Sequence, residues 1–290
     1  MFFKDTFFSK NRSLNCRGKL LDLSVPKVMG ILNVTPDSFY DGGKYNDPDK
    51  ILDKIRTMID EGADIIDVGG MSTRPGSEPV SEKEEIRRIT QAILIIHEHF
   101  PGTIISVDTY RANVARIAVK ELSVDIINDI SGGEMDKGMF DTVAELMVPY
   151  IFMHMVGTPR TMQNHINYED MISEILDYFA EKAGRLRSVG INDIVIDPGF
   201  GFSKSLEQNF HLLDHLNVFQ SLELPVMVGI SRKSMIYRTL GTEPSDSLNG
   251  TTVLNTVALL KGANILRVHD VKEAVQTVTL VKKLQRTEKL

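Results

Sequence analysis

Short apolar runs rich in isoleucine and valine recur along the chain, and each ends in a polar or glycine-containing segment. The run KVMGIL at 27–32, for example, leads directly into NVTPDS. The runs do not alternate cleanly between apolar and polar residues, which indicates strands buried on both faces, as in parallel sheets. The eight predicted strands are 27–32, 64–70, 103–107, 125–127, 150–155, 193–196, 225–230 and 264–268.

Segments with the apolar period of an amphipathic helix separate these strands. Ser81 and Glu84 form a predicted capping box, and Ile86, Ile89 and Ile93 follow it on one helix face. Further helices are predicted over 168–187 and 270–284, and near 48–61, 111–121, 137–147, 206–221 and 246–261.

Eight strand–helix units predict an α/β fold, a single (β/α)8 TIM barrel of about 250 residues. A doubly wound open sheet is the alternative, but eight units favour the barrel over five or six. Residues 25–290 contain no linker-like stretch and are expected to form one catalytic domain. Residues 1–24 stand apart, and LNCRGKLLDLS within them predicts a small hairpin that covers the bottom of the barrel.

Composition and charge restrict the class of protein. The 290 residues are 42% apolar, which is enough for one large core. A formal charge of −6 and a pI near 5.7 argue against a general nucleic-acid binder or a binder of anionic membranes. An anionic ligand would therefore need a local basic site.

The single cysteine, Cys16, excludes an internal disulfide and fits a reducing cytoplasm, where we expect it to be a structural thiol. The first residues, MFFKDTFFSKNRS, do not resemble a signal peptide. No stretch approaches the ~20 apolar residues that a membrane-spanning helix needs. We expect a soluble cytoplasmic protein.

The polar segments follow the carboxyl ends of the predicted strands. In a barrel these ends converge on one face, and that face carries the chemistry. The side chains that distinguish these ends from ordinary polar loops are Asn33, Asp67, Asp108, Asn128, His154, Asp197, Lys233, Arg267 and His269.

Two groups of residues are candidates for binding an anion. Thr73 and Arg74 lie in a loop after the second strand. Arg267 and His269 are two residues apart at the end of the eighth strand, so both point the same way if it is extended. Because barrels often bind phosphate near strands seven and eight, we favour a phosphate site here.

The acidic residues allow two interpretations. A buried carboxylate must be paired, so Asp108 or Asp197 could form an ion pair with Lys233 or Arg232. Alternatively, each could accept two adjacent N–H groups of a 2-amino-4-oxo heterocycle, with Asn128 beside it. The residues alone leave both interpretations open.

The same residues bear on metal binding and on lysine chemistry. No zinc-binding spacing is present, so Mg²⁺ held by substrate phosphates and one oxygen ligand, such as Asn33, is more plausible than a metal caged by protein. Lys233 permits a Schiff-base aldolase as a second enzyme class. Lys204 in GFGFSK lacks the spacing of a phosphate-binding loop and is interpreted as a loop lysine.

An ordered set of motifs connects these residues: GILNVTPDSF, DVGGxSTRPG, SVDT, INDISGG, MHMVGTP, DPGFGF, GISRKS and RVHD. The chain resembles the dihydropteroate synthase family of pterin-binding enzymes, targets of sulfonamides, over roughly residues 24–285. The resemblance implies a TIM barrel, a homodimer and Mg²⁺. The implied transferase reaction joins 6-hydroxymethyl-7,8-dihydropterin diphosphate to 4-aminobenzoate in folate biosynthesis, giving 7,8-dihydropteroate and diphosphate.

The resemblance also implies roles for individual residues. It assigns catalysis to Asp108, Lys233 and Asp41, and the pterin pocket to Asp108, Asn128, Asp197, Lys233, Met155 and Phe200. It assigns diphosphate to Asn33, Thr73, Arg74, Arg267 and His269, with Asn33 also on the metal, and it assigns 4-aminobenzoate to Phe39, Pro75, Arg232 and Ser234. The loops NVTPDSFYDGG and MSTRPGS would close over the site, and the dimer would form through helices around 206–221 and 246–284.

One position departs from the family, because many members have glutamate where this chain has Met71. That difference puts the hydrogen bonding behind the STRPG loop in question.

A different class of protein, the pterin-binding barrel of a methyltransferase system, should share the acid and amide set. It should lack the loops for diphosphate and aminobenzoate.

Overall fold

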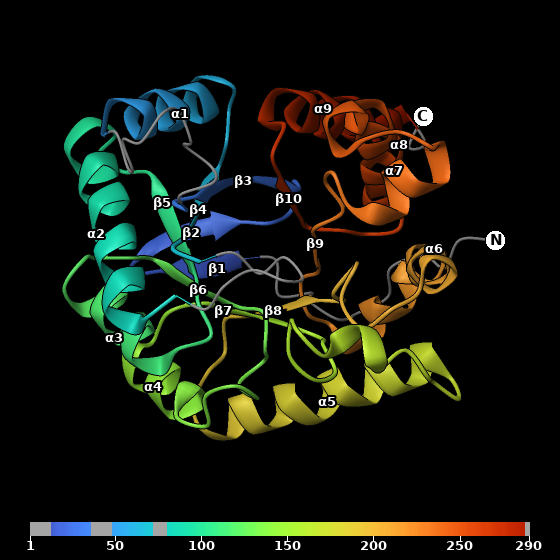
Figure 1. Ribbon diagram of the computed structural model, residues 1–290, viewed down its shortest axis with the longest axis horizontal. Helices are drawn as coiled ribbons and strands as arrows, with labels where there is room; N and C mark the ends of the chain where they lie inside the picture. Colours follow the sequence, from blue (N-terminus) through green and yellow to red (C-terminus); the bar gives the residue numbers. More distant parts are fainter. Residues whose placement is uncertain (1–12, 36–47, 72–79, 288–290) are drawn as a thin grey trace.

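The computed structural model describes residues 13–35, 48–71 and 80–287. Within these ranges, eight parallel strands lie inside an outer ring of helices (Figure 1). The strands are β3 (Lys27–Asn33), β4 (Ile65–Gly69), β5 (Ile104–Asp108), β6 (Ile126–Asp129), β7 (Tyr150–Met153), β8 (Ile194–Asp197), β9 (Met227–Val228) and β10 (Ile265–Val268).

The strands are hydrogen-bonded in the order β8-β7-β6-β5-β4-β3-β10-β9. A parallel bridge between Ile196 and Val226 joins the two ends of this sheet. The amide of Ile196 also donates to the carbonyl of Pro225 at 3.0 Å. The sheet therefore closes into the predicted barrel, and the doubly wound alternative is wrong.

Nine α-helices are present in the described ranges. They are α1 (Pro48–Asp60), α2 (Glu82–His99), α3 (Ala112–Lys120), α4 (Met139–Leu146), α5 (Met171–Ser188), α6 (Leu206–Asp214), α7 (Ser234–Leu240), α8 (Leu248–Leu260) and α9 (Val271–Thr287). Ser81 caps α2 by accepting a hydrogen bond from the amide of Glu84, while the Glu84 carboxylate binds Arg87 and Arg88.

Two helix predictions need correction. The predicted helix 206–221 is α6 followed by the 3₁₀ helix η3 (Leu216–Leu222), in which the three-residue spacing buries both Leu216 and Phe219. Helix α7 was not predicted. The residue after it, Gly241, has φ +66 and ends the helix in the left-handed conformation. A glycine at this position is the sequence signal that could have revealed the end of the helix.

Successive strand residues face alternately into the barrel and toward the helices. In β4 all five residues are buried. Ile66 and Val68 pack in the large core between the strands and the helices, whereas Ile65 packs in a separate cluster inside the barrel. This alternation directs every second residue of a strand, including Asp67, into the barrel interior.

The predicted N-terminal hairpin is present as β1 (Ser13–Cys16) and β2 (Lys19–Asp22), which pair antiparallel. Leu14, Cys16 and Leu21 are buried against residues near the beginnings of the barrel strands, such as Met29 and Ile65. The hairpin thus closes the end of the barrel opposite the polar strand ends, and burial raises the pKa of the Cys16 thiol to about 12. In the described part of the chain, no helix is both long and apolar enough to cross a membrane.

Candidate active site

The carboxyl ends of four adjacent strands place polar side chains in one row. In the strand register Asn33 lies opposite Gly69, Gly69 opposite Asp108, and Asp108 opposite Asn128. Asp197 ends β8 opposite Met153 of β7. The barrel therefore brings Asn33, Asp108, Asn128 and Asp197 to one rim, although up to 164 residues separate them along the chain (197 − 33).

An arginine crosses the barrel interior below this rim. Arg267 on β10 donates from Nε to Asp67 at 2.7 Å and from an Nη atom to Asp108 at 2.7 Å. The carboxamide of Asn128 donates to the same Asp67 oxygen at 3.1 Å. Asp67 is fully buried, and its second oxygen has no hydrogen-bond partner in the described part of the chain.

This network changes the acidity of its members. Burial raises the pKa of Asp108 to about 7, against the opposing charge of Arg267. Burial lowers the pKa of Arg267, but the carboxylates of Asp67 and Asp108 outweigh that effect and raise its pKa overall. Asp67 stood among the polar strand ends in the sequence, but its role as the centre of this network was not predicted.

A second group of charged residues lies at the ends of β8 and β9. Oδ1 of Asp197 accepts a hydrogen bond of 2.8 Å from the amide of Gly199, and burial raises the pKa of this carboxyl. The ammonium group of Lys233 donates to the carbonyl of Phe200. Burial lowers the pKa of Lys233 to about 8, although the Asp197 carboxylate opposes this shift.

Gly201 makes room for Lys233. Its φ of +80 is left-handed, and a Cβ atom there would lie 3.1 Å from Cδ of Lys233. A side chain at position 201 would therefore strain the backbone and displace the lysine. Gly201 thus allows the close approach of a lysine side chain.

The aromatic residue beside Lys233 is Phe202. The lysine Nζ lies 4.6 Å from the centre of its ring. Phe202 packs with Met155, which is buried as part of a small cluster at this end of the barrel. The ring of Phe200, in contrast, is fully buried in the core between strands and helices, so that its carbonyl and not its ring meets Lys233.

The residues predicted to bind the two other ligand groups are only partly described. The ring Nδ1 of His269 lies 3.1 Å from Oγ of Ser231. Arg232 has a left-handed φ of +56 and forms an ion pair with Asp270, which raises its pKa. Ser234 begins α7 directly after Lys233. Phe39, Asp41, Thr73, Arg74 and Pro75 lie outside the described residues.

Two further observations limit the site. No group of three or more His, Cys, Asp or Glu side chains that could hold a metal ion occurs over 13–35, 48–71 and 80–287. Half-buried Met71 lies two residues after the end of β4, and the STRPG loop after it is outside the described residues.

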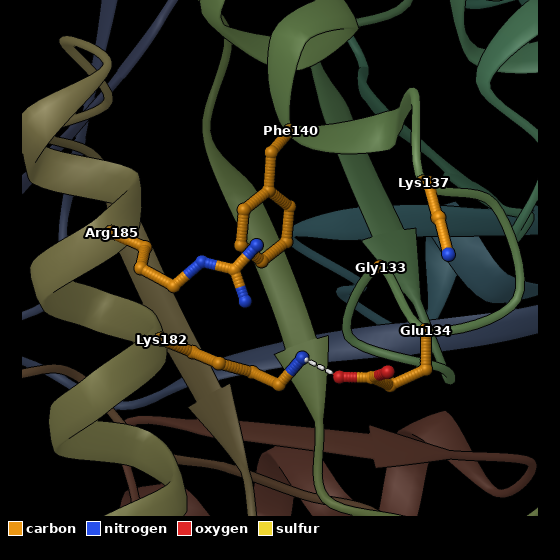
Figure 2. Close-up of a pocket in the computed structure, with 6 residues that line it drawn as sticks. All are labelled: Gly133, Glu134, Lys137, Phe140, Lys182 and Arg185. Atoms are coloured by element: carbon orange, nitrogen blue, oxygen red, sulfur yellow. Dashed lines mark hydrogen bonds and ion pairs between the residues drawn. The ribbon is translucent and has the colours of Figure 1, made fainter.

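A cavity of about 250 Å³ lies elsewhere, between the loop after β6 and helix α5. Figure 2 shows Lys182 and Arg185 reaching into it from α5, below Phe140. Lys182 donates to Glu134 and, at 2.7 Å, to the carbonyl of Gly132. None of the predicted site residues lines this cavity.

The fold and rim define a TIM-barrel protein whose carboxylates, amides and cations can hold a flat nitrogen heterocycle and an anion. The family model described as "Pterin binding enzyme" matches residues 29–269. Dihydropteroate synthase of Escherichia coli K12 is 44% identical over 270 residues, which are 92% of this chain and 95% of that protein.

Solved structures agree with this match. Yersinia pestis dihydropteroate synthase in complex with a sulfonamide drug has a TM-score of 0.88 and 40% identity, covering 94% of this chain and 99% of that one. Xanthomonas albilineans dihydropteroate synthase with 4-aminobenzoic acid has a TM-score of 0.88 and 38% identity, covering 94% and 98%. The chain belongs to the pterin binding enzyme family, and within it to the dihydropteroate synthases.

Proposed function

We propose that the protein condenses 6-hydroxymethyl-7,8-dihydropterin diphosphate with 4-aminobenzoate, giving 7,8-dihydropteroate and diphosphate. The observation that carries the proposal is the convergence of Asp108, Asn128, Asp197 and Lys233 on one barrel end in a dihydropteroate synthase chain. The interpretation of these acids as ligand-binding groups, one of two left open by the sequence, is the one we adopt.

The pterin ring would be held by its polar edge. The Asp197 carboxylate keeps one oxygen on Gly199 and has a second available to the 2-amino and ring N–H groups. Lys233 would keep its bond to the Phe200 carbonyl and donate its other N–H groups to the ring carbonyl and N5 side, with Asn128 alongside. Met155 would form part of the wall of this pocket, and we assign Phe202 to the wall in place of Phe200, whose ring is buried in the core.

Arg267 would bind the departing diphosphate together with His269, Thr73 and Arg74. Its guanidinium is already aligned by two carboxylates and is 20% exposed, so phosphate oxygens could reach its remaining N–H groups. Concentrated positive charge lowers the cost of the negative charge that develops on the leaving group.

Asn33 suits a magnesium ligand because it offers a neutral amide oxygen at the rim. Its carboxamide makes no hydrogen bond to another residue in the described part of the chain. Bound Mg²⁺ would supply charge neutralisation for the diphosphate, with most of its ligands coming from phosphate oxygens and water. Asn33 would orient that complex against β3.

The chemical step is a dissociative displacement. The bond between the pterin methylene carbon and the diphosphate oxygen breaks first, and the carbon gains positive charge that Asp108 and Asp41 would stabilise. The amine nitrogen of 4-aminobenzoate then forms the new bond and loses a proton. Orientation of a neutral amine, held with Phe39, Pro75, Arg232 and Ser234, matters more here than a strong base.

A homodimer is part of this proposal. The helices α8 and α9 carry large exposed apolar side chains, including Val253, Leu260 and Leu280, which is 70% exposed. Such a patch is typical of a protein interface. The single cysteine, Cys16, is free and buried, which fits a reducing cytoplasm as the location.

The decisive experiment measures diphosphate release from the pterin diphosphate with and without 4-aminobenzoate. We expect release that depends on both substrates and on Mg²⁺, and that a sulfonamide inhibits in competition with 4-aminobenzoate. Pterin binding without any condensation would instead support the barrel of a methyltransferase system. Borohydride trapping of a carbonyl substrate on Lys233 would support the aldolase. We expect this treatment to give no adduct.

A further inference from the structure

A buried lysine lies directly beneath the residues assigned to the pterin. Lys204 belongs to the loop between β8 and α6, as the sequence indicates, but it is only 3% exposed. Its Nζ lies 3.2 Å from the carbonyl oxygen of Gly199, 3.1 Å from that of Phe202, and 3.1 Å from Nδ1 of His154. A lysine in an ordinary loop would keep its ammonium in water.

The three acceptors match the three N–H groups of a lysine ammonium. Burial lowers the pKa of Lys204 to about 7, with the Asp197 carboxylate opposing the shift. Burial also holds the pKa of His154 well below its usual range, so the ring is neutral and Nδ1 can accept a hydrogen bond when the proton is on Nε2. The two side chains therefore form a donor–acceptor pair and not two repelling cations.

These hydrogen bonds hold the loop after β8 in a conformation that requires glycine at position 199. Gly199 has φ +75, and a Cβ atom there would lie 2.1 Å from the carbonyl oxygen of His154. The amide of His154 in turn donates to the carbonyl of Asp197 at 2.9 Å. The loop after β8 thus packs closely against the end of β7. Lys204 stabilises this packing through its buried hydrogen bonds to the loop and to His154.

The same loop carries the two contacts that orient the pterin residues. The amide of Gly199 positions the carboxylate of Asp197, and the carbonyl of Phe200 positions Lys233. Lys204 binds the carbonyl oxygens of Gly199 and Phe202, one residue before and two residues after Phe200. A shift of this segment would move both pterin contacts together.

We propose that Lys204, paired with His154, is a positioning residue of the active site, which sets the geometry of Asp197 and Lys233 for the pterin without touching the substrate. This inference rests on the proposed function, because it assigns the pterin to Asp197 and Lys233. It predicts an effect on pterin binding that a general loss of stability would not produce.

The test compares Lys204→Met with Lys182→Met. Lys182 is also a buried lysine that binds a backbone carbonyl, but it lies outside the barrel in the cavity of Figure 2. We expect Lys204→Met to raise the KM for the pterin diphosphate about tenfold, the loss typical of misplacing one strong hydrogen bond. The KM for 4-aminobenzoate and all constants of Lys182→Met should stay within about twofold of wild type.

A second pair of variants keeps the test valid if Lys204→Met does not fold. His154→Asn retains an acceptor near the Nδ1 position and should bind pterin like the wild type, whereas His154→Leu should show the raised KM of Lys204→Met. Rescue by asparagine is not expected from a purely steric role of the ring.

The outcomes separate the two levels of the proposal. No condensation by the wild-type protein would overturn the proposed function itself. An active wild type with unchanged pterin KM in Lys204→Met, or in His154→Leu where Lys204→Met does not fold, would overturn only the positioning role. A parallel loss of kcat and of both substrate affinities in Lys204→Met and Lys182→Met would also overturn it, since that pattern reports stability alone.

Discussion

The guanidinium of Arg267 and the carboxylate of Asp67, 200 residues apart in the chain, are joined by a 2.7 Å hydrogen bond inside the barrel. The arginine also binds Asp108, so one cation neutralises two buried acids. The residue proposed to bind the departing diphosphate is therefore also part of the internal support of the barrel.

Replacing Arg267 with alanine should lower stability as well as diphosphate affinity. The change leaves Asp67 and Asp108 buried without their cation, and removing one partner of a buried ion pair costs about 3–5 kcal/mol. Urea denaturation measures the loss. Arg87→Ala, at an exposed ion pair with Glu84, should cost less than about 1 kcal/mol. An Arg267→Ala protein that unfolds at the wild-type urea concentration would contradict the importance of this network.

Asp197→Asn should abolish tight pterin binding while leaving the fold intact. The asparagine oxygen can still accept a hydrogen bond from the amide of Gly199. Its second polar atom is an NH₂ donor, so it cannot accept the N–H groups of the pterin as a carboxylate oxygen does. We expect the pterin Kd, measured by calorimetry, to rise at least about 100-fold. Asp193→Asn, before β8 at the opposite end of the barrel, is the control and should bind normally. Wild-type affinity in Asp197→Asn would refute the assignment of the pocket.

Phe200→Leu and Phe202→Leu should differ in their effects. Phe200 is fully buried in the core, so its truncation should cost about 1–2 kcal/mol of stability with little change in pterin KM. Phe202 lies beside Lys233, so its truncation should raise the pterin KM more than it lowers stability. Steady-state kinetics and urea denaturation on both variants check this, and the reverse pattern would restore Phe200 as the wall of the pocket.

The free energy of unfolding should increase with pH through the mildly alkaline range. Burial lowers the pKa of Lys204 from 10.5 to about 7 and that of Lys233 from 10.5 to about 8. Between each lowered pKa and 10.5, the unfolded chain therefore binds more protons than the folded one. Stability therefore rises with pH in this window. In Lys204→Met the slope should fall by up to about 1.4 kcal/mol per pH unit. Urea denaturation from about pH 7.5 to 9.5 measures how the free energy of unfolding changes with pH. Equal slopes in the wild type and Lys204→Met would show that the pKa of Lys204 is not lowered into this range.

Leu280→Asp should convert a dimer into a monomer. Leu280 on α9 is 70% exposed, and α9 packs against α8, which carries exposed Val253 and Leu260. A buried unpaired charge opposes association. Met147 is 82% exposed at the end of α4, on the other side of the barrel (Figure 1), so Met147→Asp is the matched control. Sedimentation velocity measures the change. A wild-type monomer, or a Leu280→Asp dimer, would reject α9 as the interface.

The sequence by itself determined the order and approximate positions of the eight barrel strands, although not their exact ends, since the strand predicted over 225–230 is only Met227–Val228. Each buried run of isoleucine and valine is interrupted by glycine, proline or charge, and these local signals do not depend on what lies opposite. The strand predicted over 103–107, for example, is β5 (Ile104–Asp108). The polar residues at the ends of such strands were for the same reason identifiable as a set, and family motifs could name their roles.

Only the tertiary structure decided how these side chains pair. Whether Arg267 meets a ligand or two carboxylates depends on closure of the barrel and on the register of β10 against β3, neither of which has a local signal. The same holds for Lys204, which lies in a polar loop in sequence but is buried because the loop folds against the end of β7. Burial and charge pairing are set by neighbours distant in the chain, and these contacts control the pKa values and hence the chemistry of the site.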